Sequence, residues 1–257
     1  MPSSGLRDNS RVRELHTPAD LIRASGGDPI VVWAAQGFGP GVRAWYDGDA
    51  VAVASPGLSK RDRLAVRGPA ESVVPLVTGV LAEVGPSFRP FGAEPVVREL
   101  ADRVPGMEFG AAFGWMEATE LPEVTTTAAW LDGDAGIEAL LAEASPSSYA
   151  WPRRSGVRRW AAITGDGGEL LSVAADAWSA PEVGFLAGVA TRPVARGKGL
   201  SYQVCGFVTA ELLKLHPRAA LMVDGTNAAA LALYQKLGYT YYNVAAAGIS
   251  ASARPSE

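Results

Sequence analysis

The sequence predicts an α/β fold, and it predicts that the chain contains two such regions. Two observations carry the prediction. Short β-rich runs alternate with segments of helical periodicity along most of the chain, which is the pattern of α/β domains. In the second half, a glycine-rich turn at residues 196–201 also joins an apolar run to an amphipathic segment, as in a strand that leads into a helix.

The length allows one large domain or two of modest size. The chain has 257 residues, enough for a buried core in either arrangement. Charge, proline and short polar side chains mix at residues 117–124, and this change in composition predicts a boundary there. We therefore expect an N-terminal α/β domain over residues 1–120 and a second domain over residues 121–257.

In the first region, strand patterns come first. The run 31–35 is continuously apolar and predicts a strand, and 36–41 is a glycine-rich loop before the next strand. Residues 42–46 and 50–54 flank Asp47-Gly48-Asp49, which is typical of a β-hairpin. Helical patterns at 70–84, where Pro75 is expected to kink or shorten the helix, and at 94–104 precede a further strand at 109–116.

The second region begins with a similar succession. Residues 125–131 are β-rich, and Asp132 or Asp134 is placed to cap a helix that runs to residue 144. A loop rich in proline, serine and arginine fills 145–156, and residues 160–164 and 170–174 flank a glycine-rich turn. That turn predicts a second hairpin.

The remaining elements are predicted from their periodicity. An apolar run at 183–190 predicts a strand, and a helix follows over 199–215, with one apolar face made by Leu200, Val204, Phe207, Val208, Leu212 and Leu215. A strand at 219–223 precedes a helix at 227–237 that Gly238 ends, and two final strands follow.

Composition excludes several classes of function. The formal net charge is -4 and 19% of residues are charged, so no global basic balance indicates nucleic-acid binding. One cysteine excludes an internal disulfide, and two histidines cannot complete a zinc site of the usual cysteine and histidine spacing, which leaves only a carboxylate metal site open. The polar N-terminus and the lack of an apolar run of roughly 20 residues predict a cytoplasmic protein with no membrane partner.

Residues Arg196-Gly-Lys-Gly-Leu-Ser201 predict an anion site. The glycines allow the backbone to approach a ligand closely, and the first-turn amides of the following helix have no partner within it. Arg196 and Lys198 add positive charge at the same place. A phosphate or pyrophosphate is therefore the expected ligand.

Neither of two familiar phosphate motifs fits this segment. The sequence contains no Gly-x-x-x-x-Gly-Lys-Ser/Thr, and Gly199 is not followed by a third glycine at the Rossmann spacing. Together with Val189-Ala-Thr-Arg-Pro193 before it and Asn227, Tyr234 and Leu-Gly-Tyr239 after it, the segment resembles the GNAT superfamily of N-acyltransferases. Within that superfamily it looks most like the branch that contains glycine N-acyltransferase and its bacterial relatives. Ser201 stands where the family motif has glycine or alanine.

The resemblance implies a GNAT fold, with a mixed, mostly antiparallel sheet flanked by helices, and acetyl-CoA as cosubstrate. In that family the backbone of the strand equivalent to Val189, Ala190 and Thr191 binds pantetheine and polarises the thioester. The resemblance assigns the pyrophosphate to Arg196, Gly197, Lys198, Gly199, Leu200 and Ser201. No metal is implied. The first region, whose elements alternate similarly, is a candidate for a divergent copy, although it has no Gly-x-Gly turn of this kind.

Asn227 and Tyr234 are seven residues apart, so both lie on one side of the predicted helix. The resemblance implies that Asn227 contacts pantetheine and that Tyr234 gives its proton to the departing thiolate. A phenol has an ordinary pKa of about 10, so it acts by hydrogen bonding and late proton transfer. Cys205 falls on the buried side of its helix, which argues against a thiol nucleophile.

For the general base, Glu182 at the start of the strand 183–190 is the candidate, with Glu169 or Asp176 as substitutes. Tyr241 and Tyr242 are candidates for the acceptor pocket or for the core. The predicted activity is transfer of an acetyl or other short acyl group to a primary amine, and the alternative is a module that binds acyl-CoA without turnover. The acceptor, a small molecule or a peptide amine, the acyl length and the oligomeric state are left open by the sequence.

Overall fold

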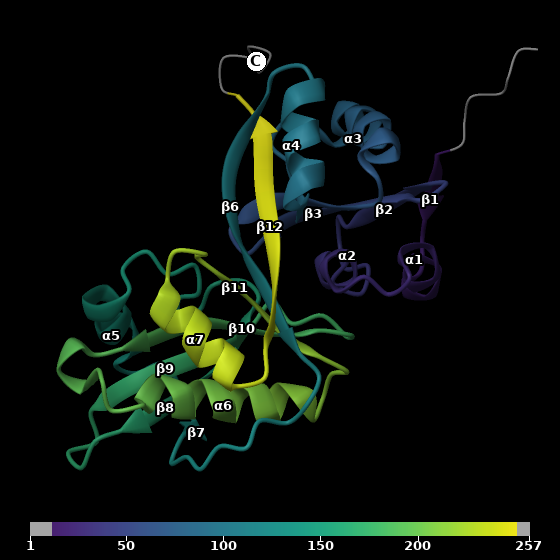
Figure 1. The fold of residues 1–257 in the computed structure, drawn as a ribbon. Coiled ribbons are helices and arrows are strands. Elements are labelled where there is room, and N and C mark those ends of the chain that lie inside the picture. The colour runs from purple at the N-terminus through teal and green to yellow at the C-terminus, as the bar shows by residue number, and fades with distance from the viewer. Residues whose placement is uncertain (1–11, 251–257) are drawn as a thin grey trace, which may run out of the picture. The chain divides into compact units, whose positions relative to one another are not determined.

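The computed structural model describes residues 12–250 (Figure 1), and this part of the chain forms two compact units. The first unit contains residues 62–110 and the described parts of 1–56 and 246–257, and the second contains 57–61 and 111–245. The division at 110/111 thus lies before the predicted boundary at 117–124. The reason is that one long strand, β6 (Met107–Ala118), runs through both positions.

The first unit contains a sheet with strand order β1-β2-β3-β4-β5. Strand β2 pairs antiparallel with β1 and β3, and β4 pairs parallel with β5. Its elements are β1 (Arg13–Leu15), α1 (Pro18–Ser25), α2 (Pro29–Ala34), β2 (Arg43–Asp47), β3 (Ala50–Leu58), β4 (Arg61–Arg67), α3 (Ala70–Val84), β5 (Arg89–Ala93) and α4 (Glu94–Arg103). The predicted hairpin and both predicted helices are confirmed, and Pro75 does not shorten α3.

The strand predicted at 31–35 was wrong, because residues 31–34 belong to helix α2 and Ala35 is its C-cap. Asp28 caps this helix by accepting hydrogen bonds from the amides of Ile30 and Val31, and Pro29 occupies its first turn. A capping aspartate followed by proline starts a helix. The short apolar run looked like a buried strand because α2 is buried on most sides. The 36–41 loop consequently follows a helix.

The second unit contains β7 to β11, in the strand order β11-β10-β9-β8-β7. Strands β7, β8, β9 and β10 pair antiparallel in turn. The elements are β7 (Ala129–Trp130), α5 (Ile137–Ala144), β8 (Val157–Thr164), β9 (Leu170–Ala177), β10 (Gly184–Thr191), a 3₁₀ turn (Pro193–Ala195), α6 (Leu200–Leu213), β11 (Ala219–Val223), α7 (Ala228–Lys236) and β12 (Thr240–Ile249). The predicted hairpin, the strand β11 and the helices α6 and α7 are confirmed.

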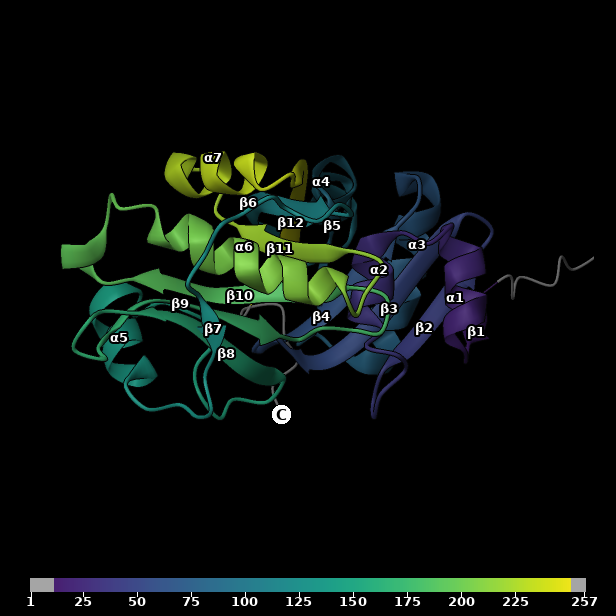
Figure 2. The same ribbon diagram turned by 90° about the horizontal axis from the view of Figure 1, so that it is seen from below.

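Helices cover the second sheet from two sides. Helices α5 and α6 both contact β9 and β10, and Figure 2 shows them on opposite sides of these strands. Val204, Cys205, Val208 and Leu212 form the buried face of α6, whereas Leu215, predicted on that face, is 66% exposed because it lies beyond the helix end. Helix α5 is capped by Gly136, and neither Asp132 nor Asp134 supplies the predicted side-chain cap.

Both units repeat one succession of elements, namely strand, helix, three strands, helix, strand, helix and strand. The first unit differs by one extra helix, α2. This internal correspondence supports the hypothesis that the first region is a divergent copy of the second.

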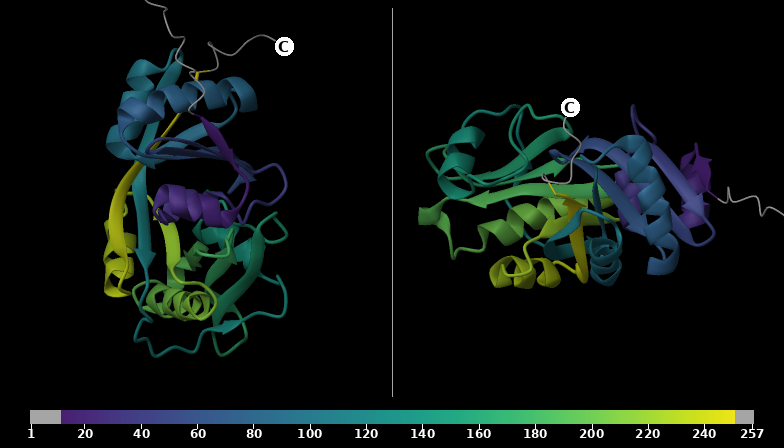
Figure 3. Two further views of the ribbon diagram at one scale, coloured as in Figure 1. Left: turned by 90° about the vertical axis from the view of Figure 1, so that its right-hand side faces the viewer. Right: turned by 90° about the horizontal axis from the view of Figure 1, so that it is seen from above.

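The strands that end the two successions, β6 and β12, exchange places in the strand order, so that β12 lies next to β5 and β6 lies next to β11. Only one strand, β12, follows α7 within the described residues, where two were predicted. In the second unit, the strand next to β11 is β6, which pairs antiparallel with it from Gly114 to Ala118. Strand β12 is the neighbour of β6 (Figure 3) and of β5. A strand from the first half of the sequence therefore completes the sheet of the second unit.

Candidate functional site

The parallel strands β10 and β11 pair over a very short distance. Gly184 lies opposite Ala219 and Phe185 opposite Ala220, and these are the paired positions of the two described strands. Strand β10 continues from there to Thr191 and β11 to Val223. The edge of β10 that faces β11 beyond Phe185 therefore has backbone groups available for an extended ligand.

A β-bulge interrupts β10 in the same region. Its register with β9 shifts between Ala187 and Ala190, and Gly188 has φ +64°. A side chain at position 188 would place its Cβ 2.5 Å from the Trp160 ring and 3.1 Å from the Ala150 Cβ. Position 188 thus requires glycine for both conformation and space. Bulges re-aim the backbone groups around them, here those adjoining Val189.

The glycine-rich loop opens onto the first turn of α6. Gly197 and Gly199 have φ of +76° and +73°, and a Cβ at either position would have no atom within 4 Å. Gly199 caps α6 without any side-chain hydrogen bond to the first-turn amides. These glycines therefore serve the backbone conformation and leave the helix N-terminus open to an anion.

Two cations of this loop have no acidic partner among residues 12–250. Arg196 is exposed and donates to the carbonyl oxygens of Thr191 and Ala144, each at 3.3 Å, and Lys198 is exposed without a polar contact. Arg192, by contrast, is paired with Glu143 at 2.6 Å. The charges of Arg196 and Lys198 are thus the ones available to a phosphate.

Hydroxyl groups join the end of β10 to the start of α6. The Thr191 Oγ1 lies 2.7 Å from the Ser201 Oγ and 2.7 Å from the Ser172 Oγ of β9. Ser201 therefore has a positioning role that glycine or alanine would not provide. The serine at this position, where the family motif has glycine or alanine, makes a hydrogen bond that joins the two ends of the loop.

Tyr234 lies in the core between α6 and α7. Its side chain is 8% exposed, and its hydroxyl contacts the thiol of Cys205, which is itself buried. Burial is the main cause that raises the pKa of Tyr234 well above 10, and the neighbouring Cys205 and Tyr239 raise it further. The phenol is therefore protonated at neutral pH and able to donate. Burial also raises the pKa of the Cys205 thiol, which agrees with an inert cysteine.

Asn227 caps the helix that carries Tyr234. Its Oδ1 accepts a hydrogen bond of 3.0 Å from the Ala230 amide, and the residue is exposed. The side-chain amide nitrogen of Asn227 takes no part in that hydrogen bond and keeps two protons to donate. Gly238, in the left-handed conformation with φ +89°, follows the end of α7 as predicted.

Comparison with known proteins agrees with this geometry. Residues 166–246 match the family model described as FR47-like protein. A GCN5-related N-acetyltransferase from Sphaerobacter thermophilus superposes with a TM-score of 0.59 at 16% identity, over 96% of this chain and 98% of that one. One from Kribbella flavida gives 0.55 at 19% identity, over 81% and 89%. The chain matches no curated protein sequence.

The chain has the fold of the GNAT acetyltransferases. A structure described as a tandem GNAT protein from the clavulanic acid biosynthesis pathway covers 96% of this chain and all of its own, with a TM-score of 0.50 at 11% identity. At these identities the likeness concerns the fold.

The structure does not bring Glu182 close to the other predicted residues. Glu182 precedes β10, seven residues before Val189, and a strand rises about 3.3 Å per residue, so the two are separated by about 23 Å along β10. The predicted general base therefore lies at the opposite end of the strand from the glycine-rich loop. A residue's place in the sequence does not show at which end of a strand the ligand binds, and the assignment of the general base stays a prediction.

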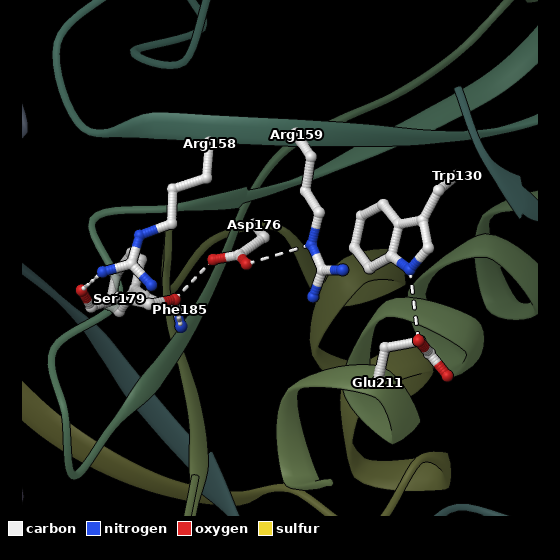
Figure 4. A network of polar contacts seen from close by, with 7 residues as sticks. All are labelled: Trp130, Arg158, Arg159, Asp176, Ser179, Phe185 and Glu211. Atoms are coloured by element: carbon white, nitrogen blue, oxygen red, sulfur yellow. Dashed lines mark hydrogen bonds and ion pairs between the residues drawn. The ribbon is translucent and has the colours of Figure 1, made fainter. Parts of the chain in front are cut away.

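The two substitutes for Glu182 also have other contacts. Asp176 is buried and accepts hydrogen bonds from the Ser179 Oγ at 2.5 Å and the Arg159 Nε at 3.3 Å (Figure 4). Ser179 in turn accepts from the Phe185 amide at 2.7 Å. This network holds the start of β10, at the opposite end of the strand from the glycine-rich loop. Glu169 lies in the β8–β9 turn, against Gly165.

Sequence reasoning missed Gly188 and Trp160. A glycine inside a strand pattern indicates a bulge or a close approach, and Gly188 carried that signal. Trp160 is separated from Gly188 by 28 positions and had no local signal. Tyr241 packs against Gly114, and Tyr242 is 47% exposed. No helix in residues 12–250 is long and apolar enough to span a membrane, and no group of three or more metal-binding side chains occurs there.

Proposed function

We propose that the chain is an acyl-CoA-dependent N-acyltransferase, most simply one that transfers acetyl to a primary amine. The observation that carries this proposal is the divergence of β10 from β11 beyond Phe185, next to a glycine-rich loop that opens onto a helix N-terminus. An extended amide chain fits the first feature, and a pyrophosphate fits the second. Coenzyme A has both parts.

In the proposed complex, the first-turn amides of α6 and the charges of Arg196 and Lys198 hold the pyrophosphate. The backbone of Val189, Ala190 and Thr191 pairs with the pantetheine amides, and the amide of Asn227 donates to the same arm. Residues 121–257 supply these groups. A role of residues 1–120 in shaping the acceptor site stays a prediction.

The reaction is direct transfer without a covalent enzyme intermediate. The amine nitrogen attacks the thioester carbon, the new C–N bond forms and the C–S bond breaks, and the thiolate leaves with the electron pair. Tyr234 donates a hydrogen bond, and late in the step its proton, to that thiolate. The amine loses its proton to water or to a base outside the residues assigned, since Glu182 lies at the far end of β10.

The alternative is a module that binds acyl-CoA without turnover. Two observations favour it, namely the distance of Glu182 from the loop and the burial of the Tyr234 hydroxyl against Cys205. The activity of Tyr234→Phe separates the two functions. An amine acceptor and a cytoplasmic location stay predictions.

The first experiment is calorimetric titration of the protein with acetyl-CoA, free CoA and a longer acyl-CoA, paired with thermal unfolding. Ligand at about 100 times the dissociation constant adds about 2.7 kcal/mol of stability, which raises the unfolding midpoint visibly. Micromolar binding supports the cosubstrate and justifies a screen of amines. A well-folded protein that binds none of the three contradicts the proposal, because the loop at 196–201 would then serve another anion.

A further inference from the structure

Three hydroxyl groups form a chain between the sheet and helix α6. The Thr191 Oγ1, in the last residue of β10, lies 2.7 Å from the Ser172 Oγ of β9 and 2.7 Å from the Ser201 Oγ of α6. The Ser172 Oγ also donates to the carbonyl oxygen of Ala190 at 3.3 Å. Ser172 is fully buried and Thr191 is 8% exposed, so their hydroxyl groups depend on these contacts for hydrogen bonding.

Thr191 also holds Arg196. The carbonyl oxygen of Thr191 accepts a hydrogen bond from the Arg196 Nε at 3.3 Å. Arg196 supplies charge to the proposed pyrophosphate site, and Ser201 is the second residue of α6, in the turn whose amides have no partner within the helix. One residue at the end of β10 thus contacts both parts of that site, the cation through its backbone and the helix through its side chain.

The first unit has no such hydroxyl contact at the corresponding positions. There the last residue of β4 is Arg67 and the second residue of α3 is Glu71. In the second unit, Thr191 and Ser201 are ten positions apart, and the segment between them contains two glycines in the left-handed conformation. Because glycine loses more conformational freedom on ordering than other residues do, this segment is costly to fix. The contact between Thr191 and Ser201 restricts it.

We infer that the hydroxyl of Thr191 is a positioning group for the pyrophosphate of acyl-CoA, with Ser201 as its partner on α6. This inference rests on the proposed function, which places the pyrophosphate at residues 196–201 and assigns only the backbone of Thr191, to pantetheine. With the contact made, the amides of α6 and the guanidinium of Arg196 are oriented before the ligand arrives. Without it, the cost of ordering the loop falls on the binding step, and the affinity decreases.

The test compares two ligands, of which one carries a pyrophosphate. Acetyl-CoA carries it, whereas S-acetyl-pantetheine has the same thioester and the same amide arm without the nucleotide. Thr191→Val keeps the branched shape and removes the hydroxyl. We expect it to raise the dissociation constant for acetyl-CoA about five- to tenfold, as loss of one hydrogen bond of ordinary strength does. The dissociation constant for S-acetyl-pantetheine, measured by NMR titration, should be unchanged.

Three further variants separate positioning from a general structural role. Thr191→Ser returns the hydroxyl and should restore the affinity for acetyl-CoA. Ser201→Ala removes the other end of the same contact, so it should weaken acetyl-CoA by the same factor, and the double variant with Thr191→Val should weaken it no further. Thr209→Val is the matched control, because Thr209 is a buried hydroxyl residue of the same helix that pairs with Tyr239 at 2.8 Å. It should lower stability and keep both affinities.

Unchanged affinity for acetyl-CoA in Thr191→Val overturns the inference, and so does equal weakening of both ligands or failure of Thr191→Ser to restore binding. Effects of Thr191→Val and Ser201→Ala that add in the double variant also overturn it, because the two residues would then act separately. If Thr191→Val does not fold, Ser201→Ala at the partly exposed start of α6 provides the same comparison of ligands. Absence of acetyl-CoA binding by folded wild-type protein instead removes the proposed function itself.

Discussion

The connection from β4 to α3 and the connection from β10 to α6 occupy the same place in the two units, and only the second is open to a ligand. Strand β4 ends at Arg67 and α3 begins at Ala70, so Gly68 and Pro69 alone join them. Strand β10 ends at Thr191 and α6 begins at Leu200, and a 3₁₀ turn and the glycine-rich loop lie between.

The glycines of the two connections have different physical reasons. A Cβ at Gly68 would lie 2.6 Å from the carbonyl oxygen of Asp49, so this glycine permits close packing of backbone on backbone. A Cβ at Gly199 meets nothing within 4 Å. Pro69, which has no N–H, also takes the place of an amide donor at the start of α3. The first unit thus uses its connection for packing, and the second leaves the amides of α6 available.

The two units also differ in the side chain at one position of the helix that precedes the last strand of each succession, α4 or α7. The seventh residue of α4 is Leu100, and the seventh residue of α7 is Tyr234, and both are buried. We expect Tyr234→Phe to lower kcat by about 10²-fold, since general acid catalysis contributes 10²-fold or more, while coenzyme affinity stays unchanged. Steady-state kinetics and calorimetry measure the two effects.

The control for that variant is Tyr239→Phe. Tyr239 is also buried, and its hydroxyl pairs with the Thr209 Oγ1 at 2.8 Å rather than with a ligand. It should lose about 1 kcal/mol of stability and keep its kcat. Equal loss of kcat and of coenzyme affinity in Tyr234→Phe would give Tyr234 a binding role, and full activity would favour the non-catalytic module.

Alanine at the two glycines sharpens the comparison further. Gly68→Ala should lower the free energy of unfolding by about 3 kcal/mol, because both the φ of +125° and the contact with Asp49 oppose a side chain. Gly199→Ala should cost about 1 kcal/mol, from its φ of +73° alone. Chemical denaturation measures both.

The effects of these two substitutions on coenzyme binding should rank in the opposite order to their effects on stability. Gly68→Ala is expected to leave the affinity for acetyl-CoA unchanged, provided that the protein is folded at the temperature of the titration. Gly199→Ala should weaken it, because the amide that follows is displaced from its orientation. If Gly199→Ala binds normally, the loop does not seat the pyrophosphate.

These contrasts also explain what the sequence could and could not predict. The loop at 196–201 was predictable because left-handed glycines, charge and a helix start are local properties of consecutive residues. Helix α2 was mistaken for a strand because a short apolar run has no period of its own. The partners of β6 and β12, and the approach of Trp160 to Gly188, depend on strand pairing between distant residues.

The two connections also differ in charge, and this difference should have a smaller effect, which is measured on coenzyme binding. Arg196 has no acidic partner within the described residues, whereas Arg67, at the matching place before α3, lies 3.6 Å from Asp28. Arg196→Gln should weaken acetyl-CoA binding by about tenfold, as loss of one charge-assisted hydrogen bond does. Arg67→Gln should leave it unchanged. An effect of the same size in both variants would show that general charge, not a pyrophosphate seat, attracts the coenzyme.

The smallest expected effect is on stability, and it concerns the side-chain contacts that hold α3 and α6 to their neighbouring strands. Helix α3 presents Glu83 to Arg43 of β2 at 3.0 Å, and α6 presents Glu211 to the Trp130 indole of β7 at 3.2 Å and to Lys214. The hydrogen bond from Lys214, followed by that from Trp130, holds the pKa of Glu211 below its ordinary value of 4.5. A carboxyl with a lowered pKa stabilises the folded state above its unfolded pKa and loses that contribution as the pH falls through the folded pKa.

Glu211→Gln should therefore be less stable than wild type by under about 1 kcal/mol near neutral pH, since the ion pair is partly exposed and a glutamine oxygen still accepts from Trp130. The difference should shrink as the pH falls below 4.5, where wild-type Glu211 becomes protonated first in the unfolded state and then in the folded one. Unfolding midpoints of both proteins across this range measure it. A difference that does not depend on pH would mean that α6 is fastened through the shape of residue 211 and not through its charge.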